Sequence, residues 1–194
     1  MKYYLDISLL PNDDLGHYFL WEKLYHQVHL ALVDYKNQQG QFNIAAGFPQ
    51  YCAQKCRLGA KLRLFAETES CLAALNIELW LAKYNDYLHI TRIKPVPEKV
   101  KSFVSYARPA FAASIKQSIT RRMKRHHETW EQASAHFEGY KPRKIKAPFV
   151  YIHSYSKQTR FPLFIAQITS KSDSEGECAF DSYGLTRQGS IPQF

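Results

Sequence analysis

The sequence predicts an α+β protein with two domains, over residues 1–95 and 96–194. Three observations support this prediction. In the first half, segments with an apolar residue at every second position alternate with segments in which apolar residues recur every three or four positions. The two halves are joined by a proline-punctuated connector, "KPVPEKV". The charge changes at the same place, because residues 1–94 carry 10 Lys+Arg and 9 Asp+Glu, whereas residues 95–194 carry 16 and 8.

The first predicted element is a strand in "YYLDISLL", where apolar or aromatic residues occupy every second position from Tyr3 to Leu9. This period is typical of a strand with one buried face. "PNDDLG" then offers turn and helix-capping residues. An amphipathic helix is predicted from about His17 to Lys36, because its apolar residues recur at three and four positions. These residues are Leu20, Leu24, Val28, Ala31 and Tyr35.

The remaining segments of the first half complete a mixed pattern. After a break at "NQQGQ" come two predicted strands, "FNIAAGF" and "KLRLFAE", a second amphipathic helix, "ETESCLAALNIELWLAKY", and a fourth strand, "DYLHITRI". The order is strand, helix, strand, strand, helix, strand, which is the ferredoxin-like (RRM-like) arrangement. Many RNA-binding domains share it, although a fold alone does not determine a function.

The second half is predicted to be an α/β domain with a basic helix. One or two helices are expected in "ASIKQSITRRMKRHHETWEQASAHF", followed by a basic loop, "KPRKIKAP". Short strands are then expected in "PFVYIHSYS", "RFPLFIAQI" and "CAFDSYGL", with a polar turn, "SKSDSEGE", before the last of them.

A cluster of cations stands out in "TRRMKRHH", which contains Arg121, Arg122, Lys124 and Arg125. A solvated charged helix face ordinarily includes compensating acids. Here no acid lies between Arg108 and Glu128, and the whole chain has a net charge of +9. The cluster therefore favours a polyanionic partner, and phosphate groups are the natural ligands for such a helix.

Other features exclude several classes of protein. Asp6 interrupts the N-terminal apolar run, so we expect neither a signal peptide nor a membrane partner, and a cytoplasmic location. The four cysteines are Cys52, Cys56, Cys71 and Cys178. Since no second Cys/His pair follows at the spacing of a zinc finger, we expect four free thiols, no metal and no cofactor.

The chain also contains a series of short motifs in a characteristic order. "YYLDI" and "HLALV" come first, an arginine-rich helix follows, and then come "PFVYIHSYS", "RFPLFI" and the C-terminal "SYGLTRQGSIPQF". From Met1 to Phe194 this series resembles the type I-F CRISPR repeat-processing endoribonucleases. The resemblance implies a metal-independent enzyme of antiviral defence, with a ferredoxin-like domain and an RNA-hairpin-binding domain. It also implies that the protein cuts the CRISPR repeat hairpin at its 3′ base, keeps the mature crRNA, and joins the other subunits of the surveillance complex.

The resemblance implies three active-site residues: His29 as the catalytic histidine, Ser154 holding the attacking 2′-hydroxyl, and Tyr183 orienting His29. His29 also lies at the border of the apolar face of its predicted helix, where a side chain can point into a groove. An unperturbed imidazole titrates near neutral pH and can therefore accept a proton. The alternatives are an ordinary surface histidine, an ordinary strand serine and a packed aromatic ring. His26 is a nearby competitor that we expect on the polar face.

The resemblance further implies a set of RNA-binding residues. Arg108 in the connector is expected to read base edges, because arginine can pair bidentately with guanine. Phe161 is expected to stack under the base pair at the foot of the hairpin, and Ser156 to lie near the scissile nucleotide. Phosphate contacts are expected from Lys116, Arg121, Arg122, Lys124 and Arg125. Two alternatives stay open for the whole chain: a non-catalytic subunit that caps the guide RNA, and a DNA-binding accessory protein.

Overall fold

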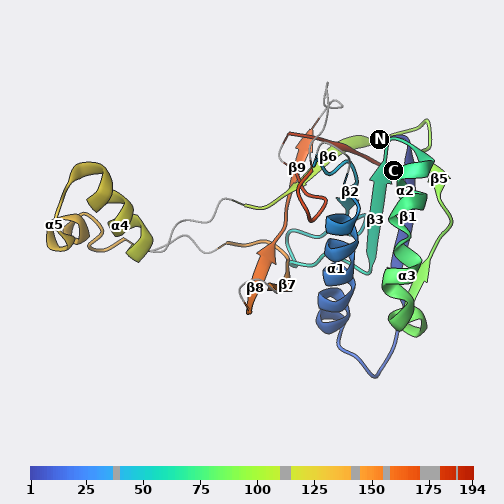
Figure 1. Cartoon of the computed structure of the whole chain (residues 1–194), viewed down its shortest axis with the longest axis horizontal. Coiled ribbons are helices and arrows are strands. Elements are labelled where there is room, and N and C mark those ends of the chain that lie inside the picture. Colours follow the sequence, from blue (N-terminus) through green and yellow to red (C-terminus); the bar gives the residue numbers. More distant parts are fainter. Residues whose placement is uncertain (37–39, 110–114, 141–144, 155–157, 171–179, 187) are drawn as a thin grey trace. The chain divides into compact units, whose positions relative to one another are not determined.

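The computed structural model describes residues 1–36, 40–109, 115–140, 145–154, 158–170, 180–186 and 188–194. The chain forms two compact units. One unit comprises Met1–Arg108 and Ala147–Phe194, and the other comprises Pro109–Lys146 (Figure 1). This division differs from the domain boundary predicted near residue 95, because segments on both sides of that residue contribute to one core. The two units are described separately below.

The first unit contains a sheet of four strands in the order β2-β3-β1-β4, in which every neighbouring pair is antiparallel. The strands are β1 (Tyr3–Leu9), β2 (Ala45–Gly47), β3 (Lys61–Ala66) and β4 (Leu88–Ile90), and the short β5 (Lys94–Pro95) also pairs with β1. The α+β class predicted from the sequence is confirmed. The name ferredoxin-like stays an interpretation of the order of these elements.

The first helix, α1 (His17–Asp34), agrees with the prediction, but the second predicted helix is interrupted. It consists of α2 (Glu69–Leu75), α3 (Ile77–Leu81) and a 3-10 turn, η1 (Ala82–Tyr87). Asn76 separates α2 from α3 with φ 47° and ψ 46°. Asparagine tolerates this left-handed conformation better than most residues, and such a residue ends a helix. One continuous helix over residues 67–84 was therefore the wrong prediction.

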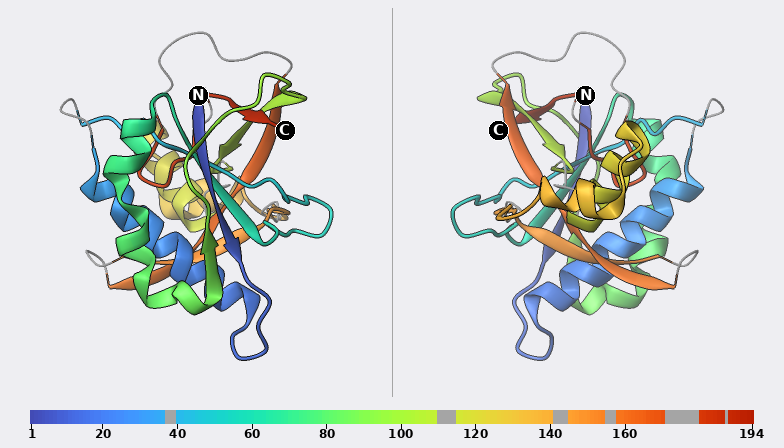
Figure 2. Two further views of the ribbon diagram at one scale, coloured as in Figure 1. Left: turned by 90° about the vertical axis from the view of Figure 1, so that its right-hand side faces the viewer. Right: turned by 90° about the vertical axis from the view of Figure 1, so that its left-hand side faces the viewer.

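The later segments of this unit form a second sheet and a hairpin. The sheet has the order β10-β6-β9, from β6 (Ser102–Ala107), β9 (Ala166–Ser170) and β10 (Ile191–Gln193). The hairpin joins β7 (Phe149–Ser154) to β8 (Thr159–Phe164). Figure 2 shows α1 and α2 on one side of the four-stranded sheet and β6, β9 and β10 on the other.

Some of these strands agree with the sequence prediction and others do not. The strand predicted in "PFVYIHSYS" is present as β7, whereas "RFPLFIAQI" is divided between β8 and β9. The described part of "CAFDSYGL", residues 180–185, is a turn and was wrongly predicted as a strand. Strands β6 and β10 were not predicted.

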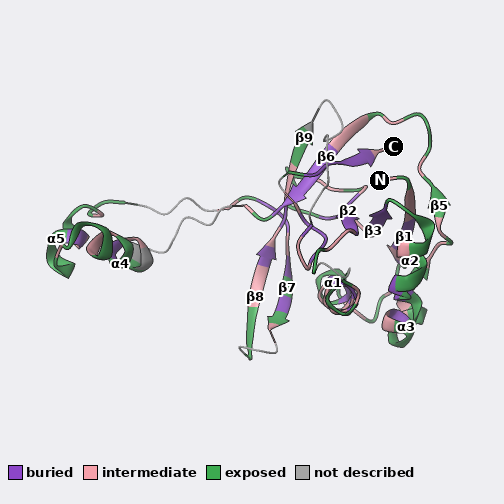
Figure 3. Ribbon diagram, turned by 45° about the horizontal axis from the view of Figure 1, so that its top comes forward, coloured by how far each residue is buried: buried purple, intermediate pink, exposed green. Residues whose placement is uncertain are grey.

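One continuous apolar core unites these elements (Figure 3). Helix α1 buries Leu20, Trp21, Leu24, Tyr25, Val28, Ala31 and Leu32. The same core includes Val104 of β6, Ile152 of β7 and Leu163 of β8. Since α1 also packs along β7, its position is determined from two sides. Any functional group on α1 is therefore held by a rigid support.

The second unit contains two helices, α4 (Ile115–His126) and α5 (Trp130–Ala135), that pack against each other. His127 between them has φ 56°, which ends α4. Thr129 begins α5 with a capping box, because its hydroxyl accepts from the Gln132 N–H while the Gln132 side chain accepts from the Thr129 N–H. Ile119 and Ala133 are buried in this unit. Within the described part of the chain, none of the helices has the length and apolar character that crossing a bilayer requires.

Candidate active site

His29 lies on α1 and is held by a backbone carbonyl from a distant part of the chain. Its Nδ1 is 2.7 Å from the carbonyl oxygen of Ser182. A carbonyl oxygen can only accept a hydrogen bond, so Nδ1 of the neutral ring must bear the proton and donate it. The other ring nitrogen, Nε2, then has a lone pair that can accept a proton. This is the tautomer that a general base requires.

Tyr183 forms one wall of the His29 site. The two rings stack with centroids 4.1 Å apart and planes inclined by 10°. Tyr183 is buried, and its carbonyl oxygen accepts a hydrogen bond from the hydroxyl of Tyr25, at 2.9 Å. Tyr25 belongs to the same helix as His29, so this bond ties the stacking ring to α1. The ring of His29 is therefore fixed through both its edge and its face.

Residues 181–185 form a tight turn, which we call the DSYGL turn. The Oδ1 atom of Asp181 accepts from the backbone N–H of Tyr183 at 2.8 Å and from that of Leu185 at 3.0 Å. The backbone of Asp181 also bonds within the turn, to the Gly184 N–H and to the Leu185 carbonyl. The carboxylate, the backbone N–H and the backbone carbonyl of Asp181 thus all bond within the turn and close it.

Gly184 anchors the DSYGL turn on the sheet. Its carbonyl accepts from the backbone N–H of Ala46 on β2, at 2.9 Å. Its φ of +70° suits glycine, and a Cβ built there would lie 2.8 Å from the Ala46 nitrogen. A larger residue at this position would push the turn, and with it the Ser182 carbonyl, away from α1.

Arg108 follows β6 and lies beside the same turn. Its Nε is 3.3 Å from Oδ2 of Asp181, and its guanidinium carbon is 4.3 Å from the centroid of the Tyr183 ring. A cavity of about 200 Å³ adjoins this pair and is lined by Ala107, Arg108, Asp181, Leu185 and Thr186. The candidate base reader is thus placed next to Tyr183, which stacks on His29.

The surroundings of His29 favour its neutral form. Burial lowers the pKa of its imidazole, the hydrogen bond to Ser182 raises it, the positive charge of Arg108 lowers it, and the negative charge of Asp181 raises it. The net result is a pKa below the ordinary value of 6.5. At neutral pH the ring is therefore unprotonated and able to accept a proton.

His26 differs from its predicted environment. It was expected on the polar face of α1, but it is half-buried and both of its ring nitrogens are shielded from solvent. Burial lowers the pKa of His26, and the nearby His29 and His153 lower it further. The side of α1 that bears His26 is therefore partly covered, and His153 of β7 is close enough to influence its pKa.

The other predicted active-site residues lie on the β7–β8 hairpin. Ser154 is the last residue of β7, partly exposed, and pairs in register with Thr159. Phe161 on β8 is half-buried and packs on the apolar core. Ser156 lies outside the described residues. The structure thus brings His29, Tyr183 and Arg108 together directly, while Ser154 and Phe161 share a hairpin that packs along α1.

The cation cluster of the second unit divides into paired and exposed side chains. Arg122 donates through Nε and Nη2 to the two carboxylate oxygens of Glu128, at 2.8 and 2.9 Å, and Nη2 also donates to His136. The other cations are exposed and have no ion pair with another described residue: Lys116, Arg121, Lys124 and Arg125. These four are available to anions, whereas Arg122 already has an anionic partner.

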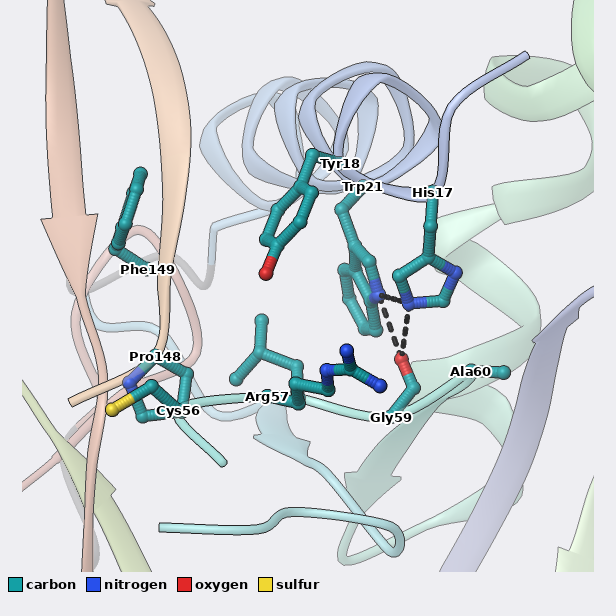
Figure 4. A pocket seen from close by; sticks show the side chains of 10 residues that line it. His17, Tyr18, Trp21, Cys56, Arg57, Gly59, Ala60, Pro148 and Phe149 are labelled. Atoms are coloured by element: carbon teal, nitrogen blue, oxygen red, sulfur yellow. Dashed lines mark hydrogen bonds between the residues drawn. The ribbon is translucent and has the colours of Figure 1, made fainter. Parts of the chain in front are cut away.

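A larger cavity, of about 350 Å³, lies where α1 begins (Figure 4). There the indole N–H of Trp21 donates to the carbonyl of Gly59 at 2.8 Å, and the ring of His17 bonds the same oxygen. The walls are largely apolar, from Tyr18, Leu58 and Phe149 among others. This cavity contains neither His29 nor any other predicted site residue. Among the described residues, no group of three or more His, Cys, Asp or Glu side chains could hold a metal ion.

Sequence reasoning missed two contributors to the site, Asp181 and the backbone of Ser182. A signal for Asp181 exists in "DSYGL", because an aspartate followed by a glycine three residues later is typical of a turn closed by a side-chain oxygen. No sequence signal identifies the Ser182 carbonyl, since every residue has one.

Comparison with known proteins identifies the family of the chain. The family described as CRISPR-associated protein (Cas_Csy4) matches residues 4–194. Two relatives bear the name CRISPR-associated endonuclease Cas6/Csy4. The protein from Escherichia coli (strain UTI89 / UPEC) is 30% identical over 195 residues, and that from Pseudomonas aeruginosa (strain UCBPP-PA14) is 30% identical over 194 residues. Both matches cover 100% of each chain. The chain therefore belongs to the Cas_Csy4 family of CRISPR-associated proteins.

Proposed function

We propose that this protein is a metal-independent endoribonuclease that binds the hairpin of CRISPR repeat RNA and cuts at its 3′ base. The observation that supports this most strongly is the bond between His29 Nδ1 and the Ser182 carbonyl, which leaves Nε2 as a proton acceptor. The names of the two relatives, both CRISPR-associated endonucleases, support the same class of activity.

In the proposed reaction, His29 Nε2 removes the proton from a ribose 2′-hydroxyl. The 2′-oxygen then attacks the adjacent phosphorus, and the bond from phosphorus to the leaving 5′-oxygen breaks. The leaving 5′-oxygen takes up one proton, which balances the proton that His29 removed, and the products are a 2′,3′-cyclic phosphate and a 5′-hydroxyl. Because the nucleophile is part of the substrate and needs only to be aligned, the reaction does not require a metal-bound water.

Three further residues have proposed roles in alignment. Ser154 holds the ribose, because a hydroxyl can both donate and accept without introducing charge. Tyr183 keeps the ring of His29 in place through the 4.1 Å stack. Phe161 offers an aromatic face to the base pair at the foot of the stem, and this sets the position of the cut. Ser156 is proposed to lie near the scissile nucleotide.

The second unit is proposed to hold the RNA phosphates. The four exposed cations, Lys116, Arg121, Lys124 and Arg125, can each replace a counterion on the RNA. Arg122 has a different part in this proposal. Its bond to Glu128 joins the end of α4 to the segment before α5, so it shapes the basic surface before RNA arrives.

Arg108 is proposed to read a guanine edge near the bottom of the stem. Its side chain is 43% exposed, and its Nε lies 3.3 Å from Oδ2 of Asp181. A guanidinium has five N–H donors in a planar fork, a geometry that can pair bidentately with a guanine edge. Its position over the Tyr183 ring would place the base that it reads close to His29.

The protein is proposed to retain its product. The cut lies outside the paired stem, so the contacts between cations and stem phosphates are the same before and after the reaction. A bound crRNA hairpin would then link the protein to the other subunits of the surveillance complex. The cytoplasm, where transcripts are made and processed in bacteria, is the proposed location.

The test is cleavage of a CRISPR repeat hairpin RNA by purified protein in excess EDTA. We expect cutting at the 3′ base of the stem, with a 5′-hydroxyl on one fragment and a cyclic phosphate on the other. Tight binding without cutting would instead identify the alternative, a non-catalytic subunit that caps the guide RNA. Cutting that stops in EDTA and returns with a divalent cation would contradict metal independence.

A further inference from the structure

We infer that Asp181 is a positioning residue, which sets the tautomer and the location of His29 through the DSYGL turn. This inference rests on the proposed function, because it assigns the support of the proposed general base. The hydrogen-bond partner of the His29 ring is the carbonyl oxygen of Ser182. Asp181 acts on His29 indirectly, because its side chain holds the turn that contains this carbonyl.

The backbone of the DSYGL turn has three partners. Three consecutive carbonyl oxygens point to three different partners. Ser182 accepts from the His29 ring, Tyr183 accepts from the Tyr25 hydroxyl, and Gly184 accepts from the backbone of Ala46. This arrangement requires a single backbone conformation over the turn.

The carboxylate of Asp181 holds that conformation. Its Oδ1 atom is the acceptor for two backbone N–H groups, those of Tyr183 and Leu185. Tyr183 and Leu185 are both buried, so loss of the acceptor would leave their N–H groups without compensation. The turn would then rearrange, and the Ser182 carbonyl would leave its position 2.7 Å from Nδ1.

Asp181 also acts on His29 through its charge. Among the described residues, the titratable and charged groups that act on His29 include Arg108 beside the turn, Asp181 within it, Tyr183 in the stack, and His26 on the same helix. The charge of Arg108 disfavours a protonated His29, and the charge of Asp181 favours it. Asp181 is paired with Arg108 at 3.3 Å, so it moderates the influence of that guanidinium on the ring.

Two substitutions separate these effects. Asp181→Ala removes both the acceptor and the charge. Asp181→Asn keeps a side-chain oxygen for the two N–H groups and removes only the charge. Asp86→Asn is the matched control, because Asp86 is an exposed aspartate in η1 with no ion pair to another described residue.

The decisive readout is ¹⁵N NMR of the His29 ring in the free protein, which reports the tautomer and its titration without any RNA. We expect the wild type, Asp86→Asn and Asp181→Asn to carry the proton on Nδ1, and Asp181→Ala to lose this preference. We also expect the His29 titration midpoint to move to lower pH in Asp181→Asn, because a negative charge that favours protonation is gone.

Single-turnover cleavage of the hairpin gives the second readout. A misplacement of about 1 Å typically costs about a hundredfold in rate, so we expect a loss of that order in Asp181→Ala with hairpin affinity retained. If Asp181→Asn cuts the hairpin at close to the wild-type rate while Asp181→Ala does not, the side-chain oxygen that holds the turn matters and the charge does not.

These experiments test the positioning role of Asp181 separately from the proposed endoribonuclease activity. An Asp181→Ala protein that keeps the Nδ1 proton of His29 overturns the inference, whatever its cleavage rate. If Asp181→Ala does not fold, an Asp181→Asn protein that keeps the acceptor oxygen but loses the Nδ1 preference of His29, or loses about a hundredfold in cleavage rate, overturns it instead. A wild-type protein that shows the Nδ1 tautomer but never cuts hairpin RNA contradicts the proposed function and leaves the positioning of His29 by Asp181 supported.

Discussion

The rings of His29 and Tyr183 stack face to face, with centroids 4.1 Å apart and planes inclined by 10°. The two residues come from opposite ends of the chain, and the core of the first unit brings them together. The stack restrains the imidazole, while the Ser182 carbonyl determines which nitrogen bears the proton. A histidine held in this way can serve as a base with little reorganisation.

Removal of the proposed base should separate cutting from binding. His29→Ala should reduce single-turnover cleavage by about a hundred- to ten-thousand-fold, the typical contribution of general acid–base catalysis. Hairpin affinity in a filter-binding assay should stay close to that of the wild type, because the phosphate contacts lie elsewhere. His89→Ala is the matched control, since His89 is an exposed histidine on β4. Equal loss of cutting in both variants would count against a specific role for His29.

The pH dependence of cutting should report the lowered pKa of His29. Only the unprotonated ring can accept the 2′-proton, so the rate should fall as pH decreases through that pKa and level off above it. Because burial holds the pKa below 6.5, the midpoint of the acid limb should lie below 6.5. The measurement is the single-turnover rate at saturating protein. A midpoint at or above 6.5 would show that the site does not disfavour the charged ring.

The basic surface of α4 should be visible in the salt dependence of binding. Each lost phosphate contact should reduce the slope of log affinity against log salt concentration by about 0.7–0.9. Arg121→Ala and Arg125→Ala should each show this change, because both side chains are exposed and have no acidic partner among the described residues. Arg122→Ala should change the slope less, since Arg122 is paired with Glu128. An unchanged slope in the Arg121/Arg125 double variant would exclude phosphate binding there.

A buried ion pair between β1 and β3 should contribute strongly to the free energy of unfolding of the first unit. Asp6 and Arg63 are opposite each other in register, with Nε 2.6 Å from Oδ1, and the guanidinium lies over the rings of Tyr4 and Phe194. Removing one partner of such a pair typically costs about 3–5 kcal/mol, so Asp6→Ala should lower the free energy of unfolding by that amount. Lys2→Ala, at an exposed pair with Glu67, should change it little.

The same pair gives stability a definite pH dependence. Burial raises the pKa of Asp6, but its hydrogen bonds with Arg63 and the nearby positive charges lower it overall, below the ordinary 3.8. The stabilisation is therefore complete above 3.8 and is lost as pH falls through the lower, folded-state value. Denaturant titrations across this range should show a smaller acid-induced loss in Asp6→Ala than in the wild type. Equal losses would mean that other groups cause the acid sensitivity.

The elements with strong periodicity could be predicted from the sequence. Helix α1 and strands β1 and β3 have apolar residues at the spacing of their secondary structure, and His29 could be placed at the edge of a buried face. The interruption at Asn76 was missed because the apolar pattern continues from α2 into α3. Strand β10 was missed because it has only three residues, and β6 was missed because it directly follows the proline-punctuated connector; the pairing between them makes both recognisable.

The supporting groups of the site depend on tertiary structure. The carbonyl of Ser182 has no side-chain signature, and its partner His29 is 153 positions away in sequence. Arg122 and Glu128 are six residues apart, a spacing that does not bring side chains together on a continuous helix. They meet because His127 adopts φ 56° and ends α4 between them.

In the proposed reaction, the RNA supplies its own nucleophile, the ribose 2′-hydroxyl, and His29 activates it. The most direct test is wild-type protein with a CRISPR repeat hairpin in which the single ribose 5′ of the scissile phosphate is replaced by deoxyribose. This RNA should bind as tightly as the unmodified hairpin and should not be cut, because the attacking oxygen is absent. Cutting of the deoxy-substituted RNA at the same position would contradict the account.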